Sequence, residues 1–302
     1  MPCPPCQRRS ALVAALAPAI SRLSFKRHGL LGLLALPEEP LLRAAKIKDR
    51  DEFLSRLALP LLTESVPTAL CRHDRDYPTA LRQLPSAPAV LYASATIERL
   101  RELRSKPTVA LVGSPTPNEY THQMTSMLAR NLTAAGVNVI SGVNDGLEGF
   151  AQRAALNAGG SSIAVMACAP DLSHLSRHDH LHRRILANGT AVSEFPPRFF
   201  PPPRWCFIAS QRITAALASL TVVVEVGDHS RALFTAEIAS ELGAEVAVVP
   251  SRITDPGGPW MFRLLYDGAH PVSCSQDVLE LISAIGAMRG RWQRSERPGL
   301  AG

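Results

Sequence analysis

Short apolar runs that end in glycine or serine recur from residue 108 onward. The clearest run covers residues 108–112 and is followed by a Gly-Ser pair, and a second covers residues 137–140 and is followed by a Ser-Gly pair. Continuous apolar runs of this length are typical of strands that are buried on both faces of a parallel sheet. The sequence predicts strands at residues 108–113, 137–141, 162–167, 190–193, 221–226 and 245–250.

Stretches with helical periodicity lie between these runs. They predict helices at residues 122–135, 146–158, 179–188, 208–218 and 232–242. Glycine, which a left-handed C-cap favours, follows four of the helices at Gly136, Gly159, Gly189 and Gly243. Strands and helices that alternate with short connections predict an α/β fold with an extended, Rossmann-like, doubly wound and mostly parallel sheet.

The segment before residue 71 has a different pattern. Leucines cluster at residues 30–36, prolines interrupt the chain, and apolar residues return on a helical period at 53–59. We therefore expect three parts, which are a small helical N-terminal module at 1–70, a Rossmann-like domain at 71–275, and a C-terminal helix and tail at 276–302. The last helix is predicted at residues 277–288.

Composition and charge favour a folded protein that binds a polyanion. Of the 302 residues, 46% are hydrophobic, which is enough for a large core. The net charge is +6, and most of the basic residues are Arg, which suits bidentate phosphate contact. This balance favours nucleic acid as the partner. A basic surface without such a partner, or a genome rich in G and C, explains the same composition.

Six scattered cysteines predict reduced thiols in a cytoplasmic protein. Cys3 and Cys6 form a Cys-x-x-Cys pair, but a four-thiolate zinc site needs two more ligands nearby. His178 and His182 belong to a histidine-rich stretch, yet no Glu or Cys completes a site with the usual spacing. A solvated, basic helix start is the preferred interpretation there, and we predict no metal and no cofactor.

No apolar run approaches the roughly 20 residues that cross a bilayer, so we expect no membrane partner. Two arginines before the apolar residues 11–20 resemble a short secretory signal. The first helix of the N-terminal module and a start codon placed too early are the alternatives. Pro18 interrupts the short run, which disfavours export.

Small residues at the strand ends are the first candidates for phosphate binding. Gly113 and Ser114 follow one strand, and Ser141, Gly142 and Gly146 follow the next. Backbone N–H groups and hydroxyls in such turns approach an oxyanion closely. The turns match neither Gly-x-Gly-x-x-Gly nor a P-loop, so NAD and ATP are not supported. An ordinary βα turn is the alternative.

Arginines alternate with aromatic residues on a proline-rich segment at 198–207. Such mixtures hold single-stranded nucleic acid, because cations meet the backbone and rings stack on bases. Arg204 and the later Arg212 are the candidates for phosphate contact. The alternative is a core-packing loop, and for the rings of Trp205 and Phe207 we prefer that buried position.

A third junction between a strand and a helix adds further candidates. Ser230 is a good N-cap, and Arg231 and Thr235 follow it where a helix N-terminus attracts anions. No Ser-His-Asp order, pair of catalytic carboxylates or nucleophile elbow is apparent in the sequence. We therefore predict a binding protein and not an enzyme.

An ordered set of short motifs runs through residues 77–269. In chain order they include Tyr77-Pro78, Val90-Leu91-Tyr92, Val112-Gly113-Ser114, Ser141-Gly142, Ser193-Glu194-Phe195-Pro196-Pro197, Arg212-Ile213, Val223-Val224-Glu225, Thr235-Ala236, Val249-Pro250 and Asp267-Gly268-Ala269. The set resembles the DNA-processing protein family DprA/Smf. The resemblance implies a cytoplasmic homodimer that binds single-stranded DNA, acts in natural transformation and loads the RecA recombinase. It implies no catalytic reaction.

The sequence departs from this family where the resemblance implies phosphate contacts. Pro115 replaces an Arg, Asp145 a basic residue and Gln152 a His, while Ser210 and Gln211 stand where Arg and Asn are expected. Each lost charge-assisted contact is worth about 1.5–3 kcal/mol. We expect two other arginines, Arg204 and Arg231, to compensate in part. The acids Asp145 and Glu148 are best explained as helix caps.

Two other functions are open at this stage beside a divergent DNA-processing protein that binds DNA through backbone donors and its arginines. A small-ligand sensor would bind a nucleotide in the same strand-end pocket, with DNA binding weakened. A nucleoside-monophosphate phosphoribohydrolase carries a Pro-Gly-Gly-x-Gly-Thr signature. Here Pro256-Gly257-Gly258-Pro259 breaks that signature after the second glycine, which disfavours the enzyme.

Overall fold

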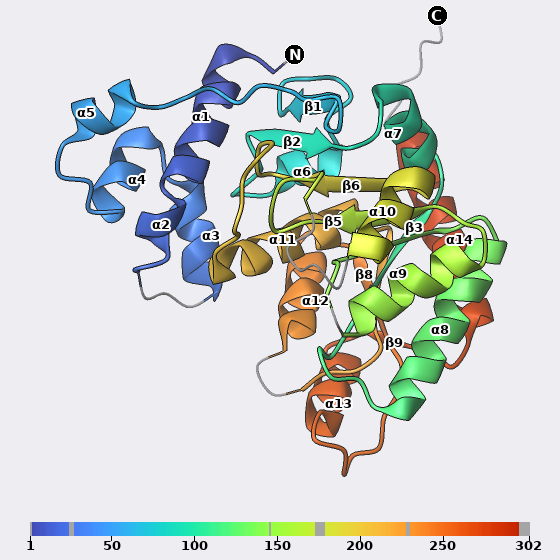
Figure 1. The fold of residues 1–302 in the computed structure, drawn as a ribbon. Helices are drawn as coiled ribbons and strands as arrows, with labels where there is room; N and C mark the ends of the chain where they lie inside the picture. Colours follow the sequence, from blue (N-terminus) through green and yellow to red (C-terminus); the bar gives the residue numbers. More distant parts are fainter. Residues whose placement is uncertain (1, 24–26, 145, 173–178, 228–229, 296–302) are drawn as a thin grey trace, which may run out of the picture.

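The computed structural model describes residues 2–23, 27–144, 146–172, 179–227 and 230–295 (Figure 1). Nine strands of this part of the chain form one sheet in the order β1-β2-β6-β5-β4-β3-β7-β8-β9. They are β1 (Thr68–Cys71), β2 (Val90–Ala93), β3 (Thr108–Val112), β4 (Asn138–Ser141), β5 (Ser162–Val165), β6 (Thr190–Ser193), β7 (Leu220–Val223), β8 (Glu245–Val248) and β9 (His270–Pro271). The predicted α/β fold with a mostly parallel, doubly wound sheet is confirmed.

The centre of the sheet is β3, which pairs in parallel with β4 on one side and with β7 on the other. From β3 the chain winds outward through β4, β5 and β6, and then returns to place β7 beside β3. The direction of winding therefore reverses between β3 and β7. In open α/β sheets, ligands bind outside the carboxyl ends of the strands at such a switch point.

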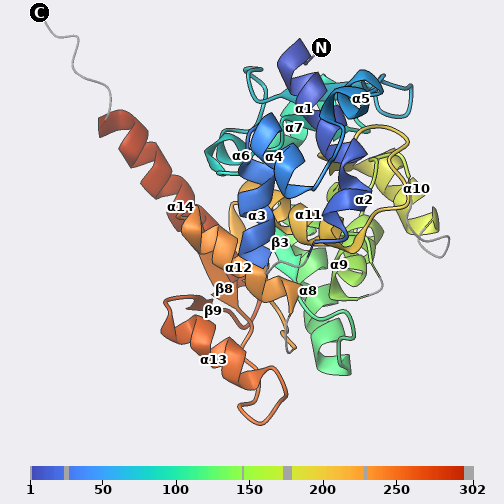
Figure 2. The same ribbon diagram turned by 90° about the vertical axis from the view of Figure 1, so that its left-hand side faces the viewer.

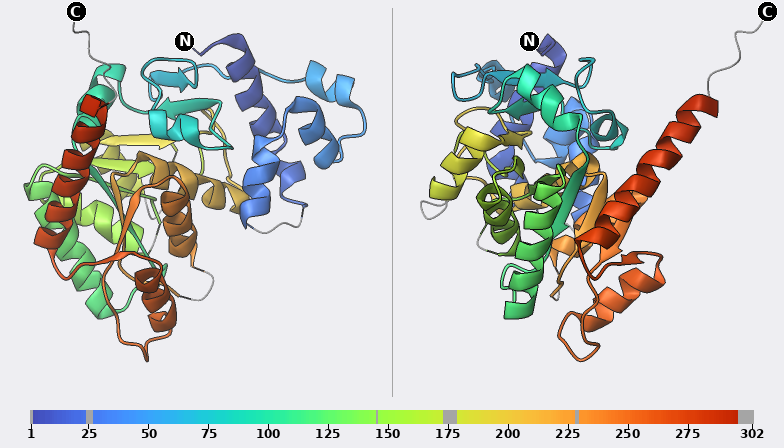
Figure 3. Two further views of the ribbon diagram at one scale, coloured as in Figure 1. Left: turned by 180° about the vertical axis from the view of Figure 1, so that it is seen from behind. Right: turned by 90° about the vertical axis from the view of Figure 1, so that its right-hand side faces the viewer.

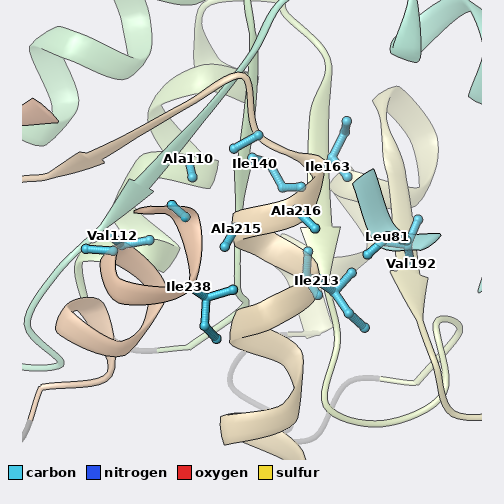
Figure 4. Packing of buried hydrophobic residues seen from close by; sticks show 14 of the residues in the cluster. Leu81, Ala110, Val112, Ile140, Ile163, Val192, Ile213, Ala215, Ala216 and Ile238 are labelled. Carbon is cyan, nitrogen blue, oxygen red and sulfur yellow. The ribbon is translucent and has the colours of Figure 1, made fainter. Parts of the chain in front are cut away.

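Alternate residues of β3 face two different helical layers. Val109 and Leu111 pack with the layer of α8 (Glu119–Ala134), α9 (Leu147–Asn157) and α14 (Ser275–Ser295). Ala110 and Val112 pack with the layer of α11 (Arg204–Leu217) and α12 (Arg231–Glu241), where Ile213 and other apolar side chains meet the sheet (Figure 4). Because every residue of β3 is buried on one face or the other, the strand reads as a continuous apolar run.

Two antiparallel strands extend the sheet beyond what the sequence predicts. β1 pairs with β2, and β2 pairs with β6, both in antiparallel register. Only the five-residue helix α6 (Thr79–Gln83) separates β1 from β2 along the chain, so the alternation of strands with long helices that marks β3 to β8 is missing here. Since β1 crosses the expected boundary at residue 70, the sheet begins inside the segment that we expect to be helical.

The N-terminal segment is helical up to residue 55, as the sequence predicts, and residues 56–67 contain no helix. Its helices are α1 (Pro4–Ala15), α2 (Ala17–Ile20), α3 (Arg27–Ala35), α4 (Glu38–Ala44) and α5 (Arg50–Ser55). Leu12, Leu30 and Leu41 of this module share one buried cluster with Trp205 and Ala209 of α11. The module therefore rests on the first half of α11 (Figure 2).

The remaining helices are α6 (Thr79–Gln83), α7 (Ile97–Arg104), α10 (Asp179–Asn188) and α13 (Gly258–Tyr266). The last helix, α14, is longer than predicted and projects from the body as a rod (Figures 2 and 3). Its first half packs on the sheet through Val278 and Ile285. Within the described chain, no helix combines the length and the apolar character that a membrane span needs.

The histidine-rich stretch differs from the expected solvated helix start. His182 is buried, and one of its ring nitrogens lies 2.9 Å from the carbonyl oxygen of Pro170. Burial lowers the pKa of this imidazole, because it disfavours the charged form. His174 and His178 lie outside the described residues, as does Asp145.

Candidate nucleic-acid interface

The carboxyl ends of β3 to β7 meet the amino-terminal ends of α8, α9, α11 and α12 at one edge of the sheet (Figure 1). The first turn of a helix leaves N–H groups without intrahelical partners, and these attract anions. The candidate residues after β3 and β4 and before α12 all lie at this edge, which includes the switch point.

The loop after β3 is folded tightly against the start of α9. The Ser114 hydroxyl accepts a hydrogen bond from the Thr116 amide at 3.1 Å, and the Ser114 carbonyl accepts one from the Leu147 amide at 3.0 Å. At Gly113, a Cβ atom would overlap the side chain of Leu147 and lie 3.1 Å from the carbonyl oxygen of Glu225. Gly113 therefore lets three chain segments approach one another.

The loop after β4 touches the loop after β3 at Gly146, the N-cap residue of α9. A Cβ atom at Gly146 would overlap the Ser114 carbonyl oxygen and the Pro115 backbone. Only glycine fits such an approach without a shift of backbone atoms. The two predicted strand-end turns therefore form one continuous surface.

Two of the predicted hydroxyl donors serve the interior. Ser141 is fully buried and donates to the Leu111 carbonyl at 2.8 Å, which ties β4 to β3. Thr235 is fully buried as well and donates to the Gln211 side chain at 2.6 Å, which ties α12 to α11. Neither hydroxyl faces the surface, so the prediction that they contact phosphate gains no support from their positions.

Ser230 is the N-cap of α12, as the sequence predicts. Its hydroxyl accepts a hydrogen bond from the Ala232 amide at 3.1 Å. Its carbonyl accepts one from the Arg27 guanidinium of α3 at 2.5 Å. Arg27 comes from the N-terminal module, and the sequence gives no signal that it reaches this edge.

Arg212 occupies a different place from the one expected of a DNA contact. Its side chain is 1% exposed, and its guanidinium makes two hydrogen bonds to the Glu194 carboxylate, at 2.6 and 2.7 Å. It also donates to the carbonyls of Ser86 and Ala209. A guanidinium that is buried and bonded in this way holds the fold together and does not present its charge to a ligand.

Gln152, which replaces the expected His, is likewise structural. It is fully buried on α9, and its amide nitrogen donates to the carbonyls of Ser141 at 2.9 Å and Ile163 at 3.1 Å. Its side-chain oxygen accepts from the Ser162 hydroxyl. These bonds join the ends of β4 and β5 beneath the surface.

Two of the predicted arginines lie at the surface of this edge. Arg204 is exposed at the first position of α11, and Arg231 is half-buried at the first position of α12. The Arg231 guanidinium carbon lies 6.0 Å from the centre of the Phe207 ring, a cation–π distance. Arg204 and Arg231 thus begin two neighbouring helices, α11 and α12, at the same edge of the sheet.

A buried carboxyl group sits behind Arg231. Glu148 lies in the first turn of α9, accepts a hydrogen bond from the Asn144 amide group and is 4% exposed. Burial raises its pKa, while Arg231 and Asn144 act in the opposite direction. The predicted capping role of Glu148 is consistent with its first-turn position.

The hollow between these groups is small. It is lined by Gly142, Asn144, Glu148, Phe207, Gln211, Arg231 and their neighbours, and its volume is about 10 Å³. That is room for about one water molecule. A ligand beside Arg231 therefore lies along the surface and does not enter this hollow.

The aromatic residues before α11 divide between core and surface. Trp205 is 4% exposed, donates to the Ala17 carbonyl at 3.3 Å and contacts the Phe195 ring edge-on, so its expected burial is confirmed. Phe207 is partly buried beside Arg231. Phe200 is 51% exposed and offers a ring to solvent.

Comparison with known proteins identifies the family of this chain. Residues 68–283 match the family described as DNA recombination-mediator protein A. The chain belongs to this family. The matched segment begins at β1 and ends within α14, so it spans the whole sheet and leaves the N-terminal helices outside. The family resemblance that the sequence motifs indicate is thereby confirmed.

Individual relatives agree with the family assignment. A Mycobacterium tuberculosis protein that carries the name DNA processing protein DprA is 31% identical over 301 residues, which cover 99% of this chain and 76% of that protein. DprA of Streptococcus pneumoniae has the same fold, with a TM-score of 0.67 at 24% identity over 90% of this chain and 92% of that one.

A third relative has been studied with regard to single-stranded DNA. The structure of DNA processing protein A from Helicobacter pylori has a TM-score of 0.61 at 25% identity, and the match covers 71% of this chain and 99% of that one. That structure is described as giving insight into the single-stranded DNA binding mode of the Helicobacter protein. DNA processing is thus the general role that the family indicates for this chain.

Proposed function

We propose that the protein binds single-stranded DNA along the carboxyl edge of its sheet. The observation that carries the proposal is the convergence of Arg204 and Arg231, at the starts of α11 and α12, with the tightly packed loops after β3 and β4. Guanidinium groups and helix N-termini at one edge suit a phosphate backbone.

The shape of the surface beside Arg231 supports an extended ligand over a compact one. The hollow beside Arg231 holds about 10 Å³, which is too small for a nucleotide, whereas Arg204 and Pro115 are open to solvent. A partly buried Phe207 ring and an exposed Phe200 ring add surfaces on which bases stack. These features favour DNA binding over the alternative of a nucleotide sensor.

Fluorescence anisotropy with a labelled oligothymidylate at low salt tests this proposal. We expect Arg204→Ala and Arg231→Ala each to weaken binding about tenfold and to lower the slope of log affinity against log salt by about 0.7. Arg130→Ala is the matched control, because Arg130 is exposed near the carboxyl end of α8, at the opposite edge. Equal effects of all three variants, or no binding by the unmodified protein, would overturn the proposal.

A gain-of-affinity variant tests the same surface from the opposite direction. Pro115 is exposed in the loop after β3, where the family resemblance implies an Arg. Pro115→Arg should tighten binding about tenfold. It should also steepen the slope of log affinity against log salt by about 0.7, the value for one phosphate contact. An unchanged affinity would show that DNA does not pass over this loop.

We further propose that the chain forms a homodimer, loads RecA and acts in natural transformation, without a chemical step of its own. Phe262 and Tyr266, one turn apart on α13, are exposed by 45% and 90%, and they offer an apolar surface for a second copy. Light scattering after size-exclusion chromatography measures the dimer. RecA filament growth on oligonucleotide coated with single-strand binding protein measures loading, and the recovered oligonucleotide should be uncut.

A further inference from the structure

Three thiols and an imidazole from distant parts of the sequence converge at the outer edge of the sheet. Their ligand atoms, which belong to Cys3, Cys6, Cys71 and His73, all lie within 4.8 Å of one another. The Cys3 and Cys6 sulfurs lie 3.3 and 3.4 Å from His73 Nδ1, and the sulfurs of Cys3 and Cys71 are 3.9 Å apart. The sequence pair Cys3-x-x-Cys6 thus finds the two further ligands that it lacks locally.

The spacing of these atoms is that of a tetrahedral metal site. Zinc holds sulfur at about 2.3 Å and nitrogen at about 2.0–2.1 Å, so tetrahedral angles place two sulfurs about 3.8 Å apart and a sulfur and a nitrogen about 3.5 Å apart. A disulfide instead needs its sulfurs at about 2.05 Å. The separation of 3.9 Å between the Cys3 and Cys71 sulfurs fits the metal and not the disulfide.

We propose that Cys3, Cys6, Cys71 and His73 bind one zinc ion. Three thiolates and one imidazole complete a tetrahedral shell and leave no position for water or substrate, so the ion is structural and takes no part in a reaction. Soft sulfur ligands also select zinc over magnesium or calcium.

The local fold brings each ligand to the site. Cys3 is the N-cap residue of α1 and Cys6 lies in its first turn, where the Cys6 amide donates to the Cys3 carbonyl at 3.0 Å. Cys71 ends β1, and a turn closed by Asp74 follows, in which the Asp74 carboxylate accepts from the Cys71 amide at 2.7 Å. That turn directs His73 back toward α1.

The surroundings of the site divide into an apolar floor and an open rim. Cys6 and Cys71 are buried among Val66, Val90 and Tyr92, while His73 is exposed. Buried neutral cysteines alone pack as small apolar residues. The convergence of three sulfurs on one ring nitrogen is the additional observation that packing does not explain. The start of α1 lies beside the edge strand β1 (Figures 1 and 3), and the ion would fasten the helix to the strand.

Metal analysis of the full-length protein, produced with zinc in the medium and passed through a chelating resin, tests the site. We expect about one zinc per chain in the unmodified protein and less than a tenth of that in Cys71→Ser and in His73→Ala. Cys274→Ser is the matched control, since Cys274 is a partly exposed cysteine outside the cluster, and it should keep its zinc. Because His73 is exposed, His73→Ala tests ligation with little disturbance of packing.

Cobalt provides a second measurement that does not depend on zinc supply during expression. Added to protein stripped of metal, Co²⁺ should give the visible absorption of a tetrahedral thiolate site, and the His73→Ala variant should lose it. Zinc-loaded protein should also protect Cys3, Cys6 and Cys71 from alkylation. The proposal is overturned if the unmodified protein takes up neither metal, if His73→Ala and Cys71→Ser retain both as fully as Cys274→Ser does, or if intact mass shows a Cys3–Cys71 disulfide in place of metal.

Discussion

At the residue scale, several polar side chains near the strand ends stabilise the fold and do not face a ligand. Arg212 is bonded to Glu194 inside the protein, and Ser141 and Thr235 donate to buried acceptors. The sequence could not separate these residues from surface residues such as Arg204, because arginine is mostly exposed in proteins, and because Ser141 ends a strand and Thr235 lies close to a helix start.

The buried pair of Arg212 and Glu194 makes a stability prediction. Arg212→Ala leaves the Glu194 carboxylate, which is 8% exposed, without its cation. We expect the free energy of unfolding to fall by about 3–5 kcal/mol, as measured by urea denaturation. Binding of oligothymidylate per folded molecule should stay unchanged, because the guanidinium does not reach the surface.

An exposed pair supplies the control for Arg212. Arg263 and Asp267 of α13 and its C-cap form a surface pair at 2.9 Å, with side chains 68% and 51% exposed. Arg263→Ala should change stability by no more than about 1 kcal/mol. If both substitutions lower the free energy of unfolding equally, burial does not explain the contribution of the Arg212 pair to stability.

The cluster of Cys3, Cys6, Cys71 and His73 could not be predicted from the sequence. The sequence contains a Cys-x-x-Cys pair and, far along the chain, a Cys-x-His pair. Either pair alone lacks half of a tetrahedral shell, so spacing predicts no metal. Only the packing of α1 against β1 brings the pairs together, and that packing is not encoded in any short motif.

At the element scale, the loops after β3 and β4 form one surface because Gly146 lets them touch. Gly146→Ala would place a methyl group on the Ser114 carbonyl oxygen and the Pro115 backbone. We expect a loss of about 1–3 kcal/mol of stability and weaker binding of oligothymidylate, because the loops must separate. Thermal unfolding and anisotropy on the same preparation measure both effects.

Gly32 in α3 is the matched control for that substitution. A Cβ atom at Gly32 meets nothing within 4 Å, and the residue lies inside a helix. Gly32→Ala should therefore raise stability by about 0.5–1 kcal/mol, since alanine loses less backbone entropy in a helix. A loss at Gly32 as large as that at Gly146 would contradict the steric explanation.

The elements themselves were predictable where strands alternate with long helices. The six central strands appear where apolar runs predict them, because both faces of each strand are covered by helices. β1 and β2 were not predicted, because only the five-residue helix α6 separates them and the alternation of strands with long helices is missing there. The sequence also could not show that β1 begins the sheet inside the segment expected to be helical.

At the scale of the whole molecule, the N-terminal helices and the sheet share one core. Trp205, Cys206 and Ala209 of α11 are buried beneath Leu12 and Leu30 of the module. A chain that starts at residue 65 would expose this apolar face. We expect it to aggregate, with light scattering above that of the full chain at the same concentration.

A substitution in the full chain separates two causes of that aggregation. Cys71→Ser removes a ligand of the proposed zinc site and keeps the module in place. If the shortened chain stays monodisperse with the thermal stability of the full chain, the module is an independent appendage. If Cys71→Ser aggregates as strongly as the shortened chain, loss of the cluster, and not the exposed face of α11, is the cause.

The central place of β3 has a consequence for how the protein is made. Val109 of β3 pairs with Val139 of β4, which the ribosome delivers soon afterwards, and with Leu220 of β7, which it delivers much later. Throughout that interval one edge of an apolar strand has no native neighbour. Unpaired strand edges on nascent chains invite pairing with other chains. The topology that creates the proposed binding edge therefore leaves the growing chain open to such pairing until β7 emerges.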